Sequence, residues 1–208
     1  MAQRSLHSRL WYVFLRYLLQ LTAVLVYRIR VTGRENVPAT GGVLLVSNHQ
    51  SHLDPPFVGI GCPRRMNYLA RRSLFRFAPF RWLIKSLDVI PLDRGGIGIS
   101  GIKESLRRLK RGEMLMIFPE GTRSYDGRIG RFMPGFTALA VRSGTAILPA
   151  AIDGAYRAWP RRQTFPGWGR IRVHYGEPIL PAEIAVLDER ELSAEVERRV
   201  HECFARCR

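Results

Sequence analysis

The segment NHQSHLD, residues 48–54, places two histidines and one aspartate close enough for acid–base chemistry. A neutral imidazole can accept a proton from a hydroxyl near pH 7, and it does so better when a carboxylate holds its other ring nitrogen. A turning loop would bring His49 to Asp54. An extended loop would favour His52, because alternate positions of an extended chain share a face. Spacing alone leaves this choice open, and a polar turn without catalytic function is the remaining interpretation.

A second polar segment, FPEGTRS at residues 118–124, has the residue types that bind an anionic substrate. Gly121 lets a ligand approach the backbone, Thr122 offers a hydroxyl, and Arg123 offers a bidentate clamp for phosphate. Glu120 fits beside a phosphate only if it orients an arginine or accepts from a hydroxyl. An ordinary turn after a strand is the alternative interpretation of this segment.

Both segments directly follow an apolar run, at residues 43–47 and 114–118, that indicates a buried strand. Loops just past the carboxyl ends of buried strands are where α/β proteins place their chemistry. Further strands are expected at residues 30–32, 66–70, 147–152 and 171–175, and helices at 10–27, 74–86, 99–109, 136–142 and 188–204. The alternation predicts an α/β fold with a mixed, largely buried sheet flanked by helices.

The most apolar window, residues 10–27, predicts an N-terminal amphipathic helix at a membrane interface. Crossing a bilayer takes about 20 apolar residues, and Arg16 and Gln20 interrupt this window. Arg9 and Tyr27 extend the same polar helical face, and arginines flank the window on both sides. A membrane-spanning helix and a helix packed on the domain core are the two alternatives.

The composition indicates a globular protein that meets anions. Among 208 residues, Lys plus Arg number 33 and Asp plus Glu 17, which gives a formal net charge of +16. Such a surplus suits nucleic acid, an anionic membrane surface or phosphorylated ligands. Three dispersed cysteines form no disulfide framework and no zinc pattern appears, which fits a reducing, cytoplasmic setting. A basic nucleic-acid-binding protein is a rival interpretation, although no recognised nucleic-acid motif is found.

Taken in order, these segments resemble the sequence blocks of the glycerolipid acyltransferase family, the 1-acyl-glycerol-3-phosphate (lysophosphatidic acid) acyltransferases. The first block, His-x4-Asp, is matched by His49 and Asp54, and this match makes His49 the base. The third block, Phe-Pro-Glu-Gly-Thr-Arg, is matched at all six positions of residues 118–123. The second and fourth blocks are matched by Arg94, within VIPLDRGG, and by Pro149, within ILPAAI.

The resemblance implies transfer of a fatty acyl group from an acyl thioester, acyl-CoA or acyl-carrier protein, to the free hydroxyl of a lysophospholipid. The expected acceptor is 1-acyl-glycerol-3-phosphate, giving phosphatidic acid, and a different lysolipid is the alternative. His49 and Asp54 act as the base dyad, and the thioester is a co-substrate, so no cofactor and no metal are expected. The residues expected to bind substrate are Arg94, Glu120, Gly121, Thr122 and Arg123.

The apolar window, the net charge and the resemblance together set the expected organisation and partners. Residues 1–29 are expected to form a membrane-associating helix, and residues 30–208 the acyltransferase domain. The partners are the two substrates, an anionic membrane surface and an acyl-carrier protein as alternative donor, with no nucleic acid. The expected location is the cytoplasmic face of the membrane, peripheral or monotopic. An inactive membrane-bound scaffold is a further alternative, and the intact dyad argues against it.

Overall fold

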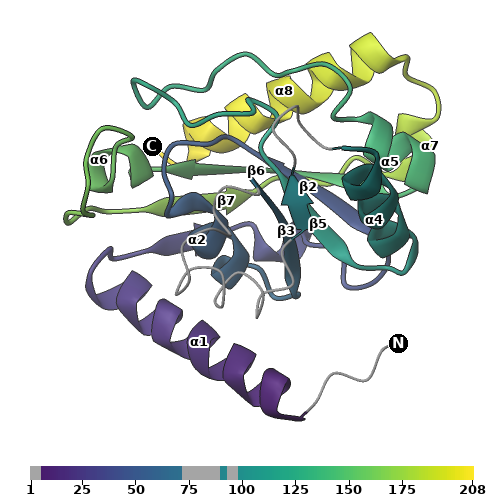
Figure 1. The fold of residues 1–208 in the computed structure, drawn as a ribbon. Helices are drawn as coiled ribbons and strands as arrows, with labels where there is room; N and C mark the ends of the chain where they lie inside the picture. Colours follow the sequence, from purple (N-terminus) through teal and green to yellow (C-terminus); the bar gives the residue numbers. More distant parts are fainter. Residues whose placement is uncertain (1–5, 72–89, 93–97) are drawn as a thin grey trace.

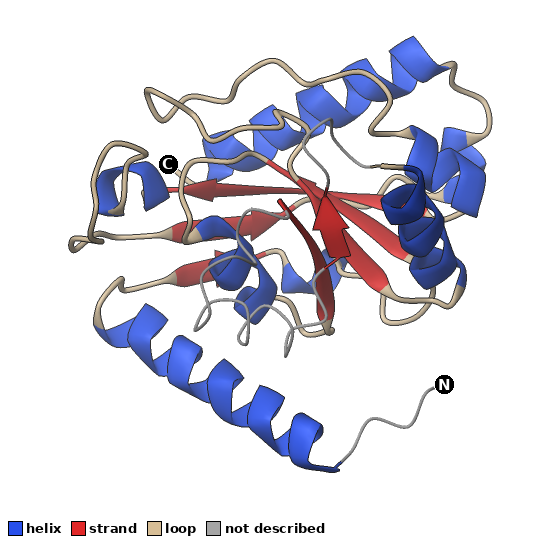
Figure 2. Cartoon of the chain, viewed as in Figure 1, coloured by secondary structure: helices blue, strands red, loops and turns tan. Residues whose placement is uncertain are grey.

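The structure, a computed structural model, describes residues 6–71, 90–92 and 98–208. Within these residues seven strands form one sheet with helices on both sides (Figures 1 and 2). The strands are β1 (Arg30–Thr32), β2 (Val43–Ser47), β3 (Met66–Arg71), β4 (Ile90–Leu92), β5 (Met114–Ile117), β6 (Ala146–Asp153) and β7 (Arg172–Tyr175). The expected helix at residues 74–86 and the candidate residue Arg94 lie outside the described residues.

The strand order is β1-β7-β6-β2-β5-β3-β4, which puts β2 and β5 near the middle. Neighbouring strands run parallel except β6 and β7, which are antiparallel. Every residue of β2 and β5 is buried, as the continuous apolar runs predict for strands covered on both faces. The mixed, largely buried α/β sheet is therefore confirmed.

Helices cover the two faces of the sheet. They are α1 (Leu6–Leu25), the 3₁₀ turn η1 (Arg34–Asn36), α2 (Asp54–Gly61), α4 (Ile99–Lys110), α5 (Ala138–Ser143), α6 (Ala155–Ala158), α7 (Pro181–Ile184) and α8 (Glu189–Arg206). Because side chains alternate along a strand, Val43 and Leu45 pack with α2 and the end of α1. Leu44 and Val46 pack on the other side with α5 and α8. Figure 1 shows this division, with α8 above the sheet and α1 and α2 below it.

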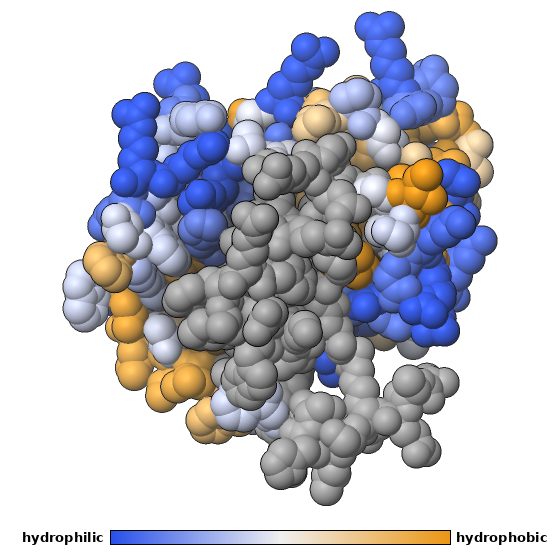
Figure 3. Space-filling view, in the orientation of Figure 1, coloured by the Kyte–Doolittle hydropathy of each residue, from blue (hydrophilic) through white to orange (hydrophobic). Residues whose placement is uncertain are grey.

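The N-terminal helix α1 turns an apolar surface outward. Its exposed apolar face comprises Val13, Phe14, Tyr17, Leu18, Leu21, Val24 and Leu25. Figure 3 shows apolar residues gathering at the lower left, over the C-terminal half of α1. Within the described part of the chain, no helix combines the length and apolar character that crossing a bilayer requires.

The inner side of α1, and the residues just after it, pack on the domain. The sequence places Gln20 and Tyr27 on one polar face without saying what that face meets, and in the structure both face the domain. The Gln20 side-chain amide donates to the backbone carbonyl of Ile60 in α2 at 3.4 Å. The Tyr27 ring packs edge-on against Phe57, with ring centroids 5.1 Å apart. The polar stripe at these positions therefore mediates packing on α2, and the apolar positions are left at the surface.

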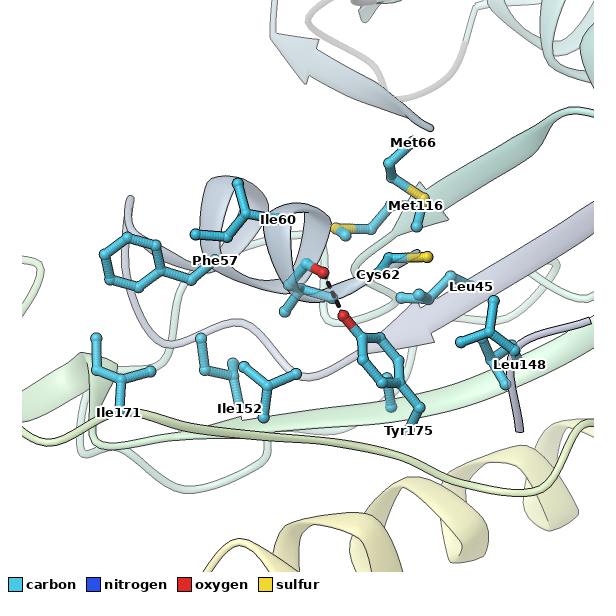
Figure 4. Close-up of a cluster of buried hydrophobic side chains, with 14 of the residues drawn as sticks. Leu45, Phe57, Ile60, Cys62, Met66, Met116, Leu148, Ile152, Ile171 and Tyr175 are labelled. Carbon is cyan, nitrogen blue, oxygen red and sulfur yellow. Dashed lines mark hydrogen bonds between the residues drawn. The ribbon is translucent and has the colours of Figure 1, made fainter. Parts of the chain in front are cut away.

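The short helix α2 is fixed to the sheet by a buried cluster, shown in Figure 4. Phe57 and Ile60 belong to one buried apolar cluster with Ile152 and Ile171, and burying an apolar side chain of this size contributes about 1.5–3 kcal/mol. The buried hydroxyl of Tyr175 in β7 donates to the carbonyl of Val58 in α2, the dashed line in Figure 4. The position of α2 matters because its first residue is Asp54.

Candidate active site

The two polar segments meet at one edge of the sheet. Strands β2 and β5 are parallel neighbours, with Val46 beside Ile117. The residues that follow each strand therefore leave the sheet on the same side, which is the common position of functional loops in α/β proteins. Segment 48–54 follows β2 and segment 118–124 follows β5, so the fold brings together two sequence blocks far apart in the chain.

His49 and Asp54 form a hydrogen-bonded pair. Nδ1 of His49 lies 2.8 Å from Oδ2 of Asp54, whose side chain is fully buried, while the His49 side chain is 18% exposed. The backbone amides of Gln50 and Ser51 also donate to the same Asp54 oxygen, which fixes the carboxylate in the turn. When Nδ1–H donates to Asp54, the Nε2 atom of His49 is left as the proton acceptor.

His52 lies apart from this pair. Its side chain is exposed, and its ring lies against Trp159, with ring centroids 5.3 Å apart. Nearby protein atoms still desolvate the imidazolium, and this effect, followed by repulsion from Arg123 and His49, lowers the pKa of His52 to about 4. The loop turns rather than extends, so the structure pairs Asp54 with His49 and leaves His52 neutral near pH 7.

Segment 118–124 holds the backbone of His49 from two sides. The amide of His49 donates to Oε1 of Glu120 at 2.7 Å, and the amide of Ser124 donates to the carbonyl of His49 at 2.7 Å. The His49 ring also stacks on Phe118, with centroids 4.1 Å apart and planes 16° apart. The imidazole thus has a fixed position before any substrate arrives, which is the arrangement that preorganised catalysis requires.

Glu120 has a different environment from the one expected for a substrate-binding residue. It is buried, and its second carboxylate oxygen, Oε2, accepts from the amide of Gly130 at 2.8 Å. Burial raises the pKa of Glu120, while the donors from His49 and Gly130 act in the opposite direction. Both oxygens are engaged by backbone amides, so the side chain ties segment 118–124 to the His49 loop.

Gly121 and Thr122, in the same segment, are exposed at the surface. Gly121 has φ +66°, a conformation that favours glycine, and a Cβ there would meet Sδ of Met133 at 2.6 Å. Thr122 is exposed and its hydroxyl accepts from Arg161 at 2.8 Å. Arg123 is half-buried and acts on His52 through its charge. Of the residues predicted from the sequence, Arg94 alone is not placed.

Two residues that flank His49 support the site and were not singled out from the sequence. The Asn48 amide pairs with the backbone of Ile152 in β6, donating at 3.0 Å and accepting at 2.9 Å. Gln50 donates to the carbonyl of Gly127 at 2.7 Å and accepts from the amide of Tyr156. An available signal was the presence of amide side chains on both sides of His49, since buried amides need partners.

Arg161 is the other residue that sequence reasoning missed. It comes 38 positions after Arg123 in the chain, yet its guanidinium contacts Thr122 and lies over the ring of Tyr125 at 4.6 Å. Nothing local in the WPRR sequence at residues 159–162 marks it as part of the site. Only the return of the chain after β6 to the same edge of the sheet brings it there.

Among residues 6–71, 90–92 and 98–208, no group of three or more His, Cys, Asp or Glu side chains is arranged to hold a metal ion. The chemistry available on the described residues is proton transfer at His49, supported by Asp54, beside arginines suited to an anion.

Comparisons with known proteins agree on the class that this fold and site define. The family model described as Acyltransferase matches residues 28–153, more than half of the chain. A 1-acyl-sn-glycerol-3-phosphate acyltransferase of Bacillus subtilis is 31% identical over 165 residues, covering 78% of this chain and 79% of that protein. The chain therefore belongs to the acyltransferase family.

Other relatives carry the same enzyme name. The chloroplastic 1-acyl-sn-glycerol-3-phosphate acyltransferase LPAT1 of Arabidopsis thaliana is 30% identical, covering 77% of this chain but only 46% of that protein. The crystal structure of the 1-acyl-sn-glycerophosphate (LPA) acyltransferase PlsC from Thermotoga maritima superimposes with a TM-score of 0.82 at 26% identity. It covers 99% of this chain and 83% of that one.

Proposed function

We propose that the protein transfers a fatty acyl group from an acyl thioester to the free hydroxyl of 1-acyl-glycerol-3-phosphate, giving phosphatidic acid. The observation that carries this proposal is the pairing of His49 with Asp54 at 2.8 Å beside the Arg123 loop. The names of the relatives support the same acceptor. The donor is acyl-CoA or acyl-carrier protein, and a different lysolipid is the alternative acceptor.

In the proposed reaction Nε2 of His49 takes the proton from the acceptor hydroxyl as its oxygen attacks the thioester carbonyl. A carbon–oxygen bond forms and the carbon–sulfur bond breaks, and the departing thiolate takes the proton back from the imidazolium. Asp54 stabilises the imidazolium while it exists. The attack is direct, so the step needs neither an enzyme nucleophile nor a metal or cofactor.

A panel of acceptors tests this function. The purified protein is incubated with several lysolipids and with labelled acyl-CoA or acyl-carrier protein, and the products are identified by mass spectrometry. We expect labelled phosphatidic acid from 1-acyl-glycerol-3-phosphate. Acylation of a lysolipid with another headgroup, with none of the phosphate monoester, would replace the proposed acceptor. Binding of nucleic acid without any acyl transfer would overturn the enzyme assignment.

We propose that Arg123 binds the acceptor phosphate, with Thr122 and Gly121 shaping the same loop and Arg94 contributing from the second sequence block. Removing one charge-assisted phosphate contact costs about 1.5–3 kcal/mol. Arg123→Ala is therefore expected to raise the KM for the lysolipid by about ten- to a hundred-fold. Steady-state kinetics with each substrate varied in turn measure this change. A rise confined to the KM of the thioester would assign the arginine to the donor instead.

We propose that Glu120 acts on catalysis through the backbone of His49 rather than by touching the acceptor. In Glu120→Gln one carboxylate oxygen becomes an NH₂ group, which cannot accept from a backbone amide. Leaving one such buried donor unpaired costs about 1–3 kcal/mol. We expect a lower kcat and a lower melting temperature, with the KM for the lysolipid unchanged. A raised KM for the lysolipid at unchanged kcat would instead show direct acceptor binding.

Because both the acceptor and the product are lipids, we propose that the site works at the cytoplasmic face of a membrane. In this proposal the region up to residue 29 associates with the membrane and the rest is the catalytic domain. The exposed apolar face of α1 contacts the lipid, and the surplus of arginine attracts anionic headgroups at about 1 kcal/mol per basic residue near the surface.

Replacing Tyr17, Leu21 and Val24 with serine tests this contact without removing the inner side of α1. The three side chains are between 57% and 67% exposed, so the fold should tolerate the change. We expect at least about tenfold weaker binding to anionic vesicles, because apolar area that entered the lipid is lost. Vesicle flotation in low and high salt measures it. The control is Val141→Ser, which alters an apolar helical residue that is 54% exposed on α5. Unchanged flotation of the triple variant would rule out α1 as the main anchor.

A further inference from the structure

Residues 159–170, here called the aromatic–arginine loop, join α6 to β7. Their sequence, WPRRQTFPGWGR, contains three arginines, three aromatic residues and no acidic residue. Phe165 is 77% exposed and Trp168 is 81% exposed, which places them among the most exposed large apolar side chains of the described residues. Exposed apolar surface that is rimmed by polar residues marks sites that bind a protein or a membrane.

The backbone of the loop that carries these exposed side chains is held by hydrogen bonds. The amide of Gly167 donates to the carbonyl of Ala158 at 2.7 Å, which closes the base of the loop. The indole nitrogen of Trp159 donates to the carbonyl of Gln163 at 3.0 Å, which holds the first turn. A Cβ on Gly169 would lie 2.9 Å from that of Ala158, so the loop packs closely at its base. Phe165 and Trp168 are therefore presented outward by a braced loop.

One end of the loop lies at the candidate active site. The Ser51 hydroxyl donates to the carbonyl of Trp159 at 2.9 Å, and the Trp159 ring lies against His52. Arg161 donates to the hydroxyl of Thr122 at 2.8 Å. The loop is therefore part of the surface around the place where an acceptor lipid would enter.

The other end of the loop lies at the end of α1. The amide of Ile171 donates to the carbonyl of Tyr27 at 3.1 Å, and the amide of Arg30 donates to the carbonyl of Ile171 at 3.0 Å. In Figure 1 the segment between α6 and β7 lies at the left, on the same side as the C-terminal end of α1. The loop thus runs between the chain just after α1 and the surface around the His49 site.

We infer that the aromatic–arginine loop is a second lipid-contacting element, which inserts Phe165 and Trp168 into the interfacial layer of an anionic membrane beside the acyl-transfer site. Tryptophan prefers this layer because its ring is apolar and its N–H remains near water. Arg161, Arg162 and Arg170 supply the complementary charge for anionic headgroups. This inference rests on the proposed function, because it gives the lipid acceptor a short route into the site.

The test uses the full chain and vesicles of phosphatidylglycerol and phosphatidylcholine. For the double variant Phe165→Ser with Trp168→Ser, we expect the lipid concentration for half-maximal binding to rise by about tenfold, because apolar area no longer enters the lipid. The control is Val186→Ser, which changes an apolar residue that is 81% exposed before α8 and should leave binding unchanged. Equal binding of the double variant and the parent protein, or an equal loss in the control, would overturn the inference.

Fluorescence gives a second, milder measurement. Vesicles with brominated acyl chains quench tryptophans that enter the lipid, and Trp168→Phe keeps an aromatic ring at the position while removing one such fluorophore. We expect the variant to lose a large share of the quenching seen with the parent protein. Unchanged quenching would place Trp168 outside the lipid. Vesicle binding is read without any acyl transfer, so a failure of the proposed reaction is seen separately in assays with a short-chain, soluble acceptor.

Discussion

Replacing His49 with alanine is expected to lower acyl transfer by about 10²–10⁴-fold, the usual cost of losing a general base. The Nε2 atom of His49 is the one available to take the acceptor proton, since its Nδ1 is hydrogen-bonded to Asp54 at 2.8 Å. The loss should appear in kcat, because the base acts in the transition state and not in binding the lipid. Single-turnover rates with saturating lysolipid measure it.

His52→Ala is the matched control for this variant. It removes the other imidazole of the same loop, which is exposed and whose pKa is lowered to about 4, so its loss should leave most of the activity. Circular dichroism and melting temperature establish that both variants fold. An equal loss of rate in the two folded variants would contradict the assignment of the base to His49.

Asp54→Asn is expected to lower the rate by a comparable factor, on the order of 10²–10⁴. The amide oxygen of asparagine can still accept from the backbone amides of Gln50 and Ser51, so the turn should keep its shape. What is lost is the negative charge that stabilises the imidazolium as the acceptor proton moves to His49. The measurement is kcat together with the melting temperature. A folded variant with near-normal kcat would show that the carboxylate charge has no part in the reaction.

The fold could be predicted well from the sequence because the central strands are marked by local apolar runs. The apolar runs that became β2 and β5 are long enough and continuous enough to indicate burial on both faces. The helix expected at residues 188–204 likewise formed as α8, and its apolar residues Leu192, Val196 and Val200 are buried. The short helices α6 and α7 escaped prediction because four residues give no periodicity to read.

The site was less predictable where it depends on contacts between distant residues. Spacing did not choose between His49 and His52, because the choice depends on whether the loop turns, and the turn is held by three donors on one Asp54 oxygen. Glu120 has the residue type of a ligand-binding group. Its partners are the backbone amides of His49 and Gly130, and no local pattern reveals such partners. The inward orientation of Gln20 was hidden for the same reason.

The attachment of α2 to the sheet has a consequence for how the protein is made. Asp54 and His49 are synthesised within a few residues of each other, but their geometry depends on much later parts of the chain. Glu120 is 71 residues beyond His49, and the Tyr175 that holds α2 is 117 residues beyond Val58. Contacts of such long range form slowly, because the entropy of closing large loops must be overcome first. A nascent chain should therefore remain inactive until β7 has left the ribosome. The apolar helix α1 emerges much earlier, so it is free to meet a membrane before the active site has formed.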